Sequence, residues 1–371
     1  SNGAGGSAKI ILRGFSSLTG DNQPLIVVDG IPMNNFTGTT DNGYFAAGLD
    51  RGNGLGDISS DDIESMSVLK GPSAAALYGT RAGNGVILIT TKSGRTKAGL
   101  GITASSNMGV ESIFIQPKFQ NSFAQGDAGA FDPTSASSWG PRIEGQTVTK
   151  WNGQEEALAS RDNLNAYLQT GVNQNHNVAF QQQYGNTSIY TAVNRLDNQS
   201  ILPTNRFTRT NLTTRMGSKF GAEDRWSTDV KVQYNNTKRV NRPINGRDWS
   251  SIYALQMLPR TLNILDFEDN TVNEFGEMIW YRGGAASFNP YWSLANERNE
   301  DQRDRFLLNG SLGYQFTAWL KGEFKAGADM YPNNLENRVR AGCPSTRNGI
   351  FITGKATFKA TNYQGFLIAQ N

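Results

Sequence analysis

The sequence is poor in the residues that most often build catalytic and metal sites. Among 371 residues there is one cysteine, Cys343, and one histidine, His176. A zinc site made of cysteine and histidine is therefore excluded within this chain, as is an internal disulfide. No Ser/His/Asp or Cys/His catalytic arrangement is visible either. We therefore expect no enzymatic activity, no metal site and no cofactor.

Long hydrophobic runs are also missing. The longest are Leu25 to Val28 and Val86 to Ile89, far shorter than the roughly 20 apolar residues of a membrane-spanning helix. Their absence excludes helical membrane proteins only. A transmembrane β-barrel carries apolar residues at every second position of its strands, and its average composition looks polar.

Charge of one sign is not concentrated anywhere in the chain. There are 35 basic and 32 acidic residues, a formal net charge of +3, and both kinds are spread along the sequence. No block of like charge indicates a nucleic-acid-binding tail. The chain starts with SNGAGG, without a methionine or a signal peptide, which is typical of a mature fragment.

Residues 1 to about 95 contain short, continuous apolar runs between glycine-rich turns: KIIL, PLIVVDG, MSVLK and GVILITT. Such runs predict strands of a small sheet that is buried on both faces. Two short helices are expected between the strands. Asp61 is a good N-cap, with Glu64 completing a capping box, and Pro72 can open a helix that Gly79 ends. The N-terminal region is thus predicted to be a compact mixed α/β unit.

From about residue 99 the pattern changes to long alternation of apolar and polar residues. Period two over ten or more residues predicts strands with one apolar and one polar face. Their length matches the roughly 9–11 residues that cross a bilayer, and aromatic residues near several strand ends are typical of an interfacial girdle. Eight strands are expected, near 99–110, 175–184, 187–197, 206–220, 225–238, 304–316, 319–331 and 362–371.

The links between these strands alternate in length. Long links are expected near 111–174, 239–303 and 332–361, and each is followed by a shorter one wherever the chain continues. Outer-membrane barrels have short periplasmic turns and long extracellular loops, so this alternation predicts such a barrel.

The barrel is expected to be large. An eight-stranded barrel has room inside only for side chains, and a 95-residue domain does not fit there. We therefore predict a transmembrane antiparallel β-barrel of about 22 strands with an N-terminal mixed α/β plug. Residues 1–95 would be the plug domain, incomplete at its N-terminus, and residues 96–371 the first part of the barrel.

Two glycine-rich segments and a group of aspartates resemble ligand sites. The segments SNGAGGSAK and RGNGLG lack the spacing of a phosphate-binding or dinucleotide-binding loop, and turns are the better interpretation. The aspartates do not follow the spacing of an EF-hand, so helix caps and solvated turns explain them better than calcium. They are Asp41, Asp50, Asp57, Asp61 and Asp62.

Aromatic residues gather in the predicted loops. Exposed aromatic side chains suit stacking on sugar rings or a protein interface. Alternatively, they anchor long loops to one another, and both interpretations remain open. The candidates for contact with a ligand or a protein lid are Trp139, Trp151, Trp249, Trp280, Tyr281, Tyr291 and Trp292.

Two segments resemble the plug domain of SusC/RagA-type TonB-dependent transporters of Bacteroidota: ILRGFSSLTGDNQPLIVVDGIPM and DIESMSVLKGPSAAALYGTRAGNGVILITTKSG. Four later segments look like the first part of the same family's barrel: LQTGVNQNHNVAF, MLPRTLNI, NPYWSLANERNEDQRDRF and AGADMY. Family members also carry an N-terminal extension, a TonB box and the start of the plug, which are missing here, as is most of the barrel.

The resemblance implies an importer in the outer membrane, in contact with its lipid. A SusD-like lipoprotein lid would capture the nutrient, and TonB, energised by ExbB and ExbD, would displace the plug. Substrates would be mainly oligosaccharides, or else oligopeptides. The rival hypothesis is a soluble, surface-attached, β-rich adhesin or glycan-binding module. An enzyme such as a glycoside hydrolase, which needs a facing carboxylate pair, comes third.

The resemblance also implies which residues hold the plug. In related transporters, basic residues of the RG and LKGP motifs pair with carboxylates of the barrel wall, and these positions are Arg13 and Lys70 here. A charge that faces a polar wall favours a paired, releasable contact. The alternative is that each cation neutralises a nearby plug carboxylate such as Glu64. Arg13, Lys70 and Glu64 are thus the candidate residues of the contact between plug and barrel.

Overall fold

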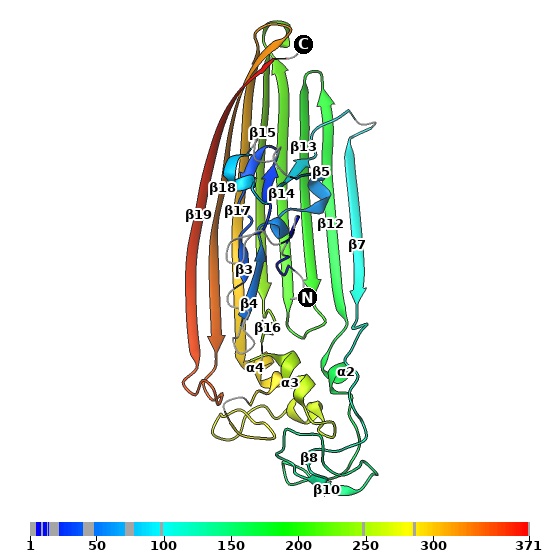
Figure 1. The fold of residues 1–371 in the computed structure, drawn as a ribbon. Coiled ribbons are helices and arrows are strands. Elements are labelled where there is room, and N and C mark those ends of the chain that lie inside the picture. The colour runs from blue at the N-terminus through cyan, green and yellow to red at the C-terminus, as the bar shows by residue number, and fades with distance from the viewer. Residues whose placement is uncertain are drawn as a thin grey trace.

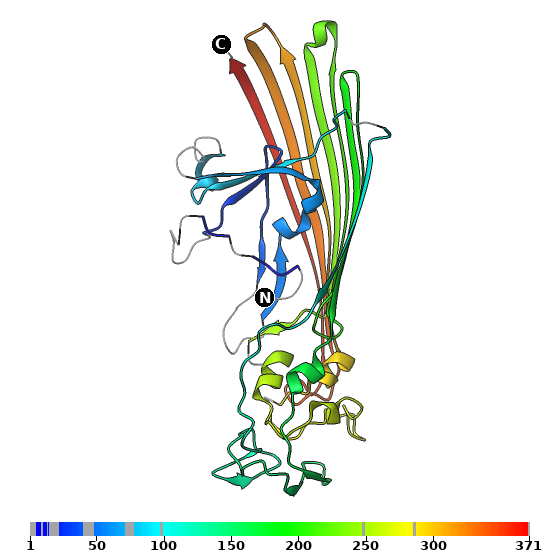
Figure 2. The same ribbon diagram turned by 90° about the vertical axis from the view of Figure 1, so that its right-hand side faces the viewer.

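The computed structural model describes residues 5–8, 10–12, 14, 22–39, 48–70, 78–96, 99–246, 249–284 and 287–369. Its largest feature is one tall, twisted sheet, which we call the wall. The described residues up to 96 form a smaller N-terminal unit that lies against one face of the wall (Figures 1 and 2). Two long links between wall strands fold together at one end of the sheet.

The wall is an eight-stranded antiparallel sheet in the order β19-β18-β17-β15-β14-β13-β12-β7. Each wall strand pairs with the next wall strand along the chain, so the predicted number of strands and their antiparallel arrangement are confirmed. The strands are β7 Ile102–Glu111, β12 Gly171–Tyr184, β13 Thr187–Gln199, β14 Arg206–Phe220, β15 Trp226–Val240, β17 Glu297–Gln315, β18 Leu320–Val339 and β19 Ile350–Ala369.

The long link predicted at residues 332–361 is wrong. β18 continues to Val339 and β19 begins at Ile350, and these two residues pair with each other at the end of the ladder. Residues 332–339 of β18 lack a continuous apolar face, and the backbone ladder needs none, so this strand extends past the pattern that predicted it. In β19 the alternation is present, with Ile350, Ile352 and Phe358 on one face, and the predicted start at residue 362 missed it.

The two faces of the wall reverse the usual distribution of polar and apolar residues. On the outer face, Val230 and Val232 are 43% and 46% exposed, whereas Lys231 and Gln233 on the inner face are 1% and 0% exposed. The period-two pattern therefore sorts side chains as predicted, but the polar side chains are the buried ones. They are covered because the N-terminal unit packs against the inner face (Figure 2).

The N-terminal unit is built on a four-stranded sheet in the order β2-β1-β6-β5. β1 and β6 are parallel, and the other neighbours are antiparallel. Ile26 and Ile89 pack in one apolar cluster, whereas Val27 and Val86 pack in another. The sheet is thus buried on both faces, as its continuous apolar runs predict. Its strands are β1 Leu25–Val28, β2 Ile31–Met33, β5 Ile63–Leu69 and β6 Val86–Thr91.

The helix predicted from Asp61 is wrong. Only a short 3-10 turn, η2 (Ser60–Asp62), forms, and its N-cap is Ser59, whose side chain accepts from the backbone N–H of Asp61. Glu64 lies on β5, because the following residues alternate and pair with β6. The helix predicted from Pro72 falls on residues outside the described part. Gly79, at φ +67, begins the 3-10 turn η3 (Gly79–Ala82).

A second small sheet connects the N-terminal unit to the wall. Its order is β16-β4-β3, and β16 directly follows wall strand β15. Ile244 of β16 pairs with Leu49 of β4, so the N-terminal unit and a wall link share backbone hydrogen bonds. The members are β3 Thr37–Thr39, β4 Gly48–Asn53 and β16 Ile244–Asn245, and the 3-10 turn η1 Leu55–Asp57 follows β4.

The links 112–170 and 241–296 pack against each other at one end of the wall. Leu164 and Tyr167 of the first link share an apolar cluster with Leu255 and Phe267 of the second. No helix in the described residues is long and apolar enough to cross a membrane. The elements here are β8 Gly126–Asp127, β9 Ala130–Phe131, β10 Thr147–Thr149, β11 Glu155–Ala157, α2 Asn163–Tyr167, α3 Ser251–Met257, η5 Ile264–Phe267 and α4 Pro290–Asn296; η4 (Ala222–Asp224) lies in the short link before β15.

Candidate functional site

The interface between the N-terminal unit and the wall centres on Asp57. This aspartate ends the turn η1, and none of its surface is exposed. Arg303 of β17 donates from Nη1 to both carboxylate oxygens, at 3.1 Å each, and Arg305 donates to one of them at 3.1 Å. Arg239 of β15 lies 4.0 Å away. One buried carboxylate of the N-terminal unit thus meets three guanidinium groups of the wall.

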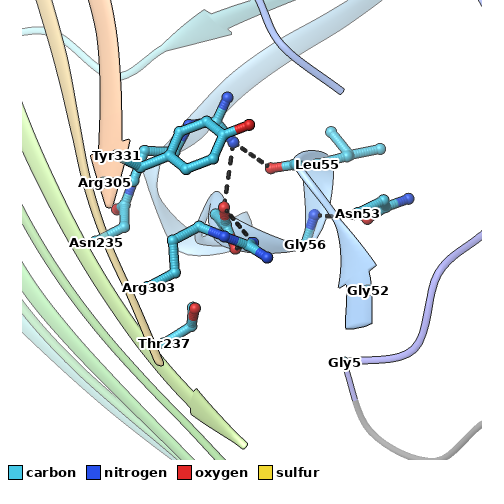
Figure 3. Close-up of polar contacts among 12 residues, drawn as sticks. Gly5, Gly52, Asn53, Leu55, Gly56, Asn235, Thr237, Arg303, Arg305 and Tyr331 are labelled. Atoms are coloured by element: carbon cyan, nitrogen blue, oxygen red, sulfur yellow. Dashed lines mark hydrogen bonds and ion pairs between the residues drawn. The ribbon is translucent and has the colours of Figure 1, made fainter. Parts of the chain in front are cut away.

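Glycines let the arginines approach this turn. A Cβ on Gly54 would lie 2.2 Å from the backbone oxygen of Asn34 and 2.9 Å from Nη1 of Arg305. Gly52, at φ +76, would place a Cβ 2.9 Å from Nη2 of Arg239. Figure 3 shows Arg303 and Arg305 reaching toward the segment that contains Gly52 and Gly56. The RGNGLG segment is therefore a turn, as predicted, and its glycines also make room for wall cations.

A second ionic contact lies at the end of β1. Asp29 accepts from Nζ of Lys231 at 2.5 Å and lies 3.3 Å from Nη1 of Arg215, and both cations belong to the wall. Thr91 donates to the same carboxylate from its backbone N–H and its hydroxyl. Burial alone would raise the pKa of Asp29, but the charge and hydrogen bond of Lys231, with Arg215, outweigh it and hold the pKa below 3.8.

Two adjacent aspartates contact neutral groups of the wall. Asp62 accepts from the Tyr190 hydroxyl at 2.9 Å and from Thr213 at 2.7 Å. Asp61 accepts from the side-chain amides of Asn175 and Asn194, at 2.9 Å each. The described residues contain no group of histidine, cysteine or carboxylate side chains that fits a metal ion. These aspartates bind the wall instead.

The ionic contacts run opposite to the predicted polarity. The N-terminal unit supplies aspartates and the wall supplies cations, whereas the prediction paired basic plug residues with wall carboxylates. Arg13 lies outside the described residues, and Lys70 is exposed just after β5. Glu64 forms an ion pair with Arg95, on the segment that leaves β6, so its described contact is not with the wall. The role of Arg13 and Lys70 stays a prediction.

Sequence reasoning missed the main contacts, although a signal was available. Arg305 falls on the polar face of a predicted strand, and Arg239 and Arg303 lie one residue beyond the predicted strand ends, where the same alternation continues. A polar strand face rich in arginine indicates a buried ionic partner if that face is interior. For Asp57, Asp61 and Asp62 the sequence favours caps and solvated turns over calcium, whereas in the structure all three contact the wall.

The predicted aromatic residues mostly hold the two links together. Trp151 stacks on Phe267 with ring centroids 4.8 Å apart, and Trp280 lies 4.5 Å from the same ring. Tyr291 meets Tyr167 edge to face at 5.3 Å. Tyr281 and Trp292 are buried, and Trp249 packs against the Trp292 cluster. Trp139 differs, because it is 59% exposed beside Phe123.

A partly buried lysine adds an ionic link between the same segments. Nζ of Lys150, in the first link, lies 2.6 Å from Asp266 of the second link and 2.8 Å from Glu156. Burial would lower the pKa of Lys150, but its hydrogen bonds to the two carboxylates raise it overall. The two links therefore form one packed body rather than two independent loops.

Comparison with known proteins matches this architecture. The family model of the TonB-dependent receptor plug domain matches residues 1–86. TonB-dependent receptor P26 of Formosa agariphila is 27% identical over 371 residues, which is 98% of this chain and 33% of that protein. TonB-dependent receptor SusC of Bacteroides thetaiotaomicron is 30% identical over 237 residues, 63% of this chain and 21% of that protein. The chain therefore spans about a third or less of the length of these relatives.

Solved structures share the fold. The RagAB peptide transporter superposes with a TM-score of 0.65 at 19% identity, over 98% of this chain and 41% of that one. The closed-closed state of the RagAB peptide importer gives a TM-score of 0.64 at 17% identity, over 98% and 41% of the two chains. At this identity the likeness shows the arrangement of strands and N-terminal unit.

Proposed function

Because the chain belongs to the SusC-type TonB-dependent receptors, which are outer-membrane β-barrels with a plug domain, we propose that it forms part of an active nutrient importer. In this proposal the N-terminal unit is the plug and the wall is a segment of the barrel. The relatives are receptors and not enzymes.

The observation that carries the proposal is the distribution of side chains on the wall, with apolar residues on the outer face and polar residues on the covered inner face. Its outer face carries apolar side chains from Phe306 to Tyr314 on β17, of which Phe306 and Leu312 are exposed, and the plug covers the polar inner face. That stretch is roughly 26 Å long at about 3.3 Å per residue, or roughly 20 Å across a bilayer at a tilt of about 40°. An exposed apolar band suits lipid, and a polar interior suits a hydrated passage.

The packed links support a partner at the outer end. Long links of outer-membrane barrels face the cell exterior, and here they form one body with the exposed Trp139 on it. We propose that this body docks a SusD-like lipoprotein that delivers the nutrient, an oligosaccharide or an oligopeptide. TonB, driven by ExbB and ExbD, would then displace the plug and its aspartates from the wall.

Energy-dependent uptake by the full-length receptor tests the proposal. Cells that carry the receptor should deplete an oligosaccharide or oligopeptide from the medium, and deletion of the receptor gene or of TonB should stop the depletion. Pull-down of the solubilised receptor should recover a lipoprotein, and mass spectrometry would identify the ligand.

The adhesin alternative makes opposite predictions. A barrel requires detergent and migrates differently on a gel before and after heating. A full-length receptor that stays monodisperse in plain buffer and imports nothing would overturn the proposal.

A further inference from the structure

The inner face of the wall presents a row of basic side chains to the plug. Two of them contact Asp29 and three lie at Asp57. Arg209 of the wall donates to the plug backbone at Gly56 and Ile58, and Arg242, in the link just after β15, donates to Gly5. The seven cations in these described contacts are Arg209, Arg215, Lys231, Arg239, Arg242, Arg303 and Arg305.

Fewer carboxylates of the wall accompany this row. Asp229, Asp301 and Asp329 pair with Arg215, Arg239 and Arg305. In the described contacts, six wall cations and Arg242 of the following link thus meet three wall carboxylates, an excess of four positive charges. The plug brings four aspartates to the same interface, namely Asp29, Asp57, Asp61 and Asp62. The plug is therefore the counter-ion of the wall.

Several guanidinium N–H groups at the interface have no acceptor in the described residues. They are Nε of Arg209, of Arg239 and of Arg303, and Nη1 of Arg242, for which the described part of the chain, plug included, offers no hydrogen-bond partner. A guanidinium group can only donate, and a buried cation is costly unless it is paired. When the four aspartates leave with the plug, the wall needs negatively charged acceptors still more.

We propose that the passage opened by plug displacement selects anionic nutrients, oligomers that carry carboxylate or sulfate groups. This inference rests on the proposed import function and adds the charge class of the substrate. A passage lined by one sign of charge raises the local concentration of the opposite charge. Arginine binds carboxylate and sulfate oxygens through paired N–H donors, and a row of such groups passes an anion from one to the next.

Ion selectivity of the full-length receptor in planar bilayers tests the inference without knowledge of the nutrient. The urea concentration is raised until the plug unfolds while the barrel stays folded. The reversal potential of the resulting current is then measured in a potassium chloride gradient. We expect the openings to favour chloride over potassium by roughly fivefold to tenfold, the lower range of electrostatic focusing. Lys231→Gln with Arg303→Gln should bring the permeability ratio close to one.

A matched control lies on the same strand. Lys238 of β15 points to the outer face and pairs there with Glu300, so Lys238→Gln removes one cation without touching the passage. It should leave the permeability ratio unchanged. Openings that are unselective or favour potassium would overturn the inference and leave the import proposal standing. No openings at any urea concentration that the barrel survives would contradict the import proposal itself.

An uptake experiment distinguishes the two kinds of anionic nutrient, acidic oligosaccharides and acidic peptides. Cells with the full-length receptor are given a mixture of neutral and uronate-bearing oligosaccharides and of neutral and acidic peptides of equal length. We expect TonB-dependent depletion of an acidic member, sugar or peptide, at least about fivefold faster than of its neutral match. Equal or faster depletion of the neutral members overturns the inference.

Discussion

Lys231 and Asp29 lie 202 positions apart in the sequence, and their side chains meet with Nζ 2.5 Å from Oδ2. Lys231 is 1% exposed and the Asp29 side chain 7% exposed, so neither charge is accessible to solvent. The pair joins the first residue of the β1–β2 turn to wall strand β15. Among the residues that the structure describes, it is one of two places where a plug carboxylate forms ion pairs with wall cations.

The first prediction concerns this pair. Asp29→Asn or Lys231→Gln alone should weaken plug docking by about 3 kcal/mol, because each leaves the other charge buried without its partner. The double variant should cost clearly less than the sum of the two single changes. Hydrogen exchange at the β1 amides in the full-length receptor measures the docking. Strictly additive effects would mean that the contact contributes no coupling energy.

The second prediction is a loss of plug docking in acid. The pKa of Asp29 is held below 3.8 in the docked state by Lys231 and Arg215. A depressed pKa stabilises docking fully above the ordinary value, and this contribution is lost as pH falls through the docked value. The urea concentration that releases the plug should therefore stay level above about pH 5 and fall below about pH 4. Asp29→Asn should flatten part of that fall; an unchanged profile contradicts the assignment.

The third prediction concerns the glycine beside the arginine cluster. Gly54→Ala should destabilise plug docking by roughly 1–3 kcal/mol, as overpacking of a tight site does. The added Cβ would meet backbone of Asn34 at 2.2 Å as well as Nη1 of Arg305, and backbone cannot rotate away. Gly283→Ala is the control, because nothing lies within 4 Å of its Cβ position. Equal urea midpoints for the two variants would contradict the close approach.

Much of the fold could be predicted from the sequence, because the wall repeats one simple pattern. Apolar residues at every second position fix which side chains share a face, and the eight strands follow from it. The alternating pattern does not predict a strand correctly where one face is not continuously apolar, or where a neighbouring strand decides the local structure. Residues 332–339 are strand without a continuous apolar face, and the Asp61 helix gives way to a strand because β6 lies beside it.

The site was harder to predict, since it depends on which segment covers which face. Asp57 and Arg303 are 246 positions apart, and nothing local to either residue indicates the other. A sequence shows that a strand face is polar, but not that another unit seals it. From the sequence alone, the default interpretation of an aspartate near a turn is a helix cap, and the default for the partner cations is exposure to solvent.

The last prediction separates the two roles of the loop aromatics. Trp151 stacks on Phe267 between the two links, so Trp151→Ala should destabilise the packed body by about 2–3 kcal/mol, less than a fully buried tryptophan because its ring is only partly covered. Limited proteolysis of the full-length receptor should then cut links 112–170 and 241–296 at least about tenfold faster, since open forms become more populated.

Trp139→Ala should leave proteolysis unchanged, because this ring is exposed, and should weaken recovery of the lipoprotein in pull-down if Trp139 lies in that interface. Faster cleavage in both variants would show that Trp139 also holds the links together. Unchanged proteolysis and recovery for Trp139→Ala would remove it from the docking surface, while the packing role of Trp151 would stand.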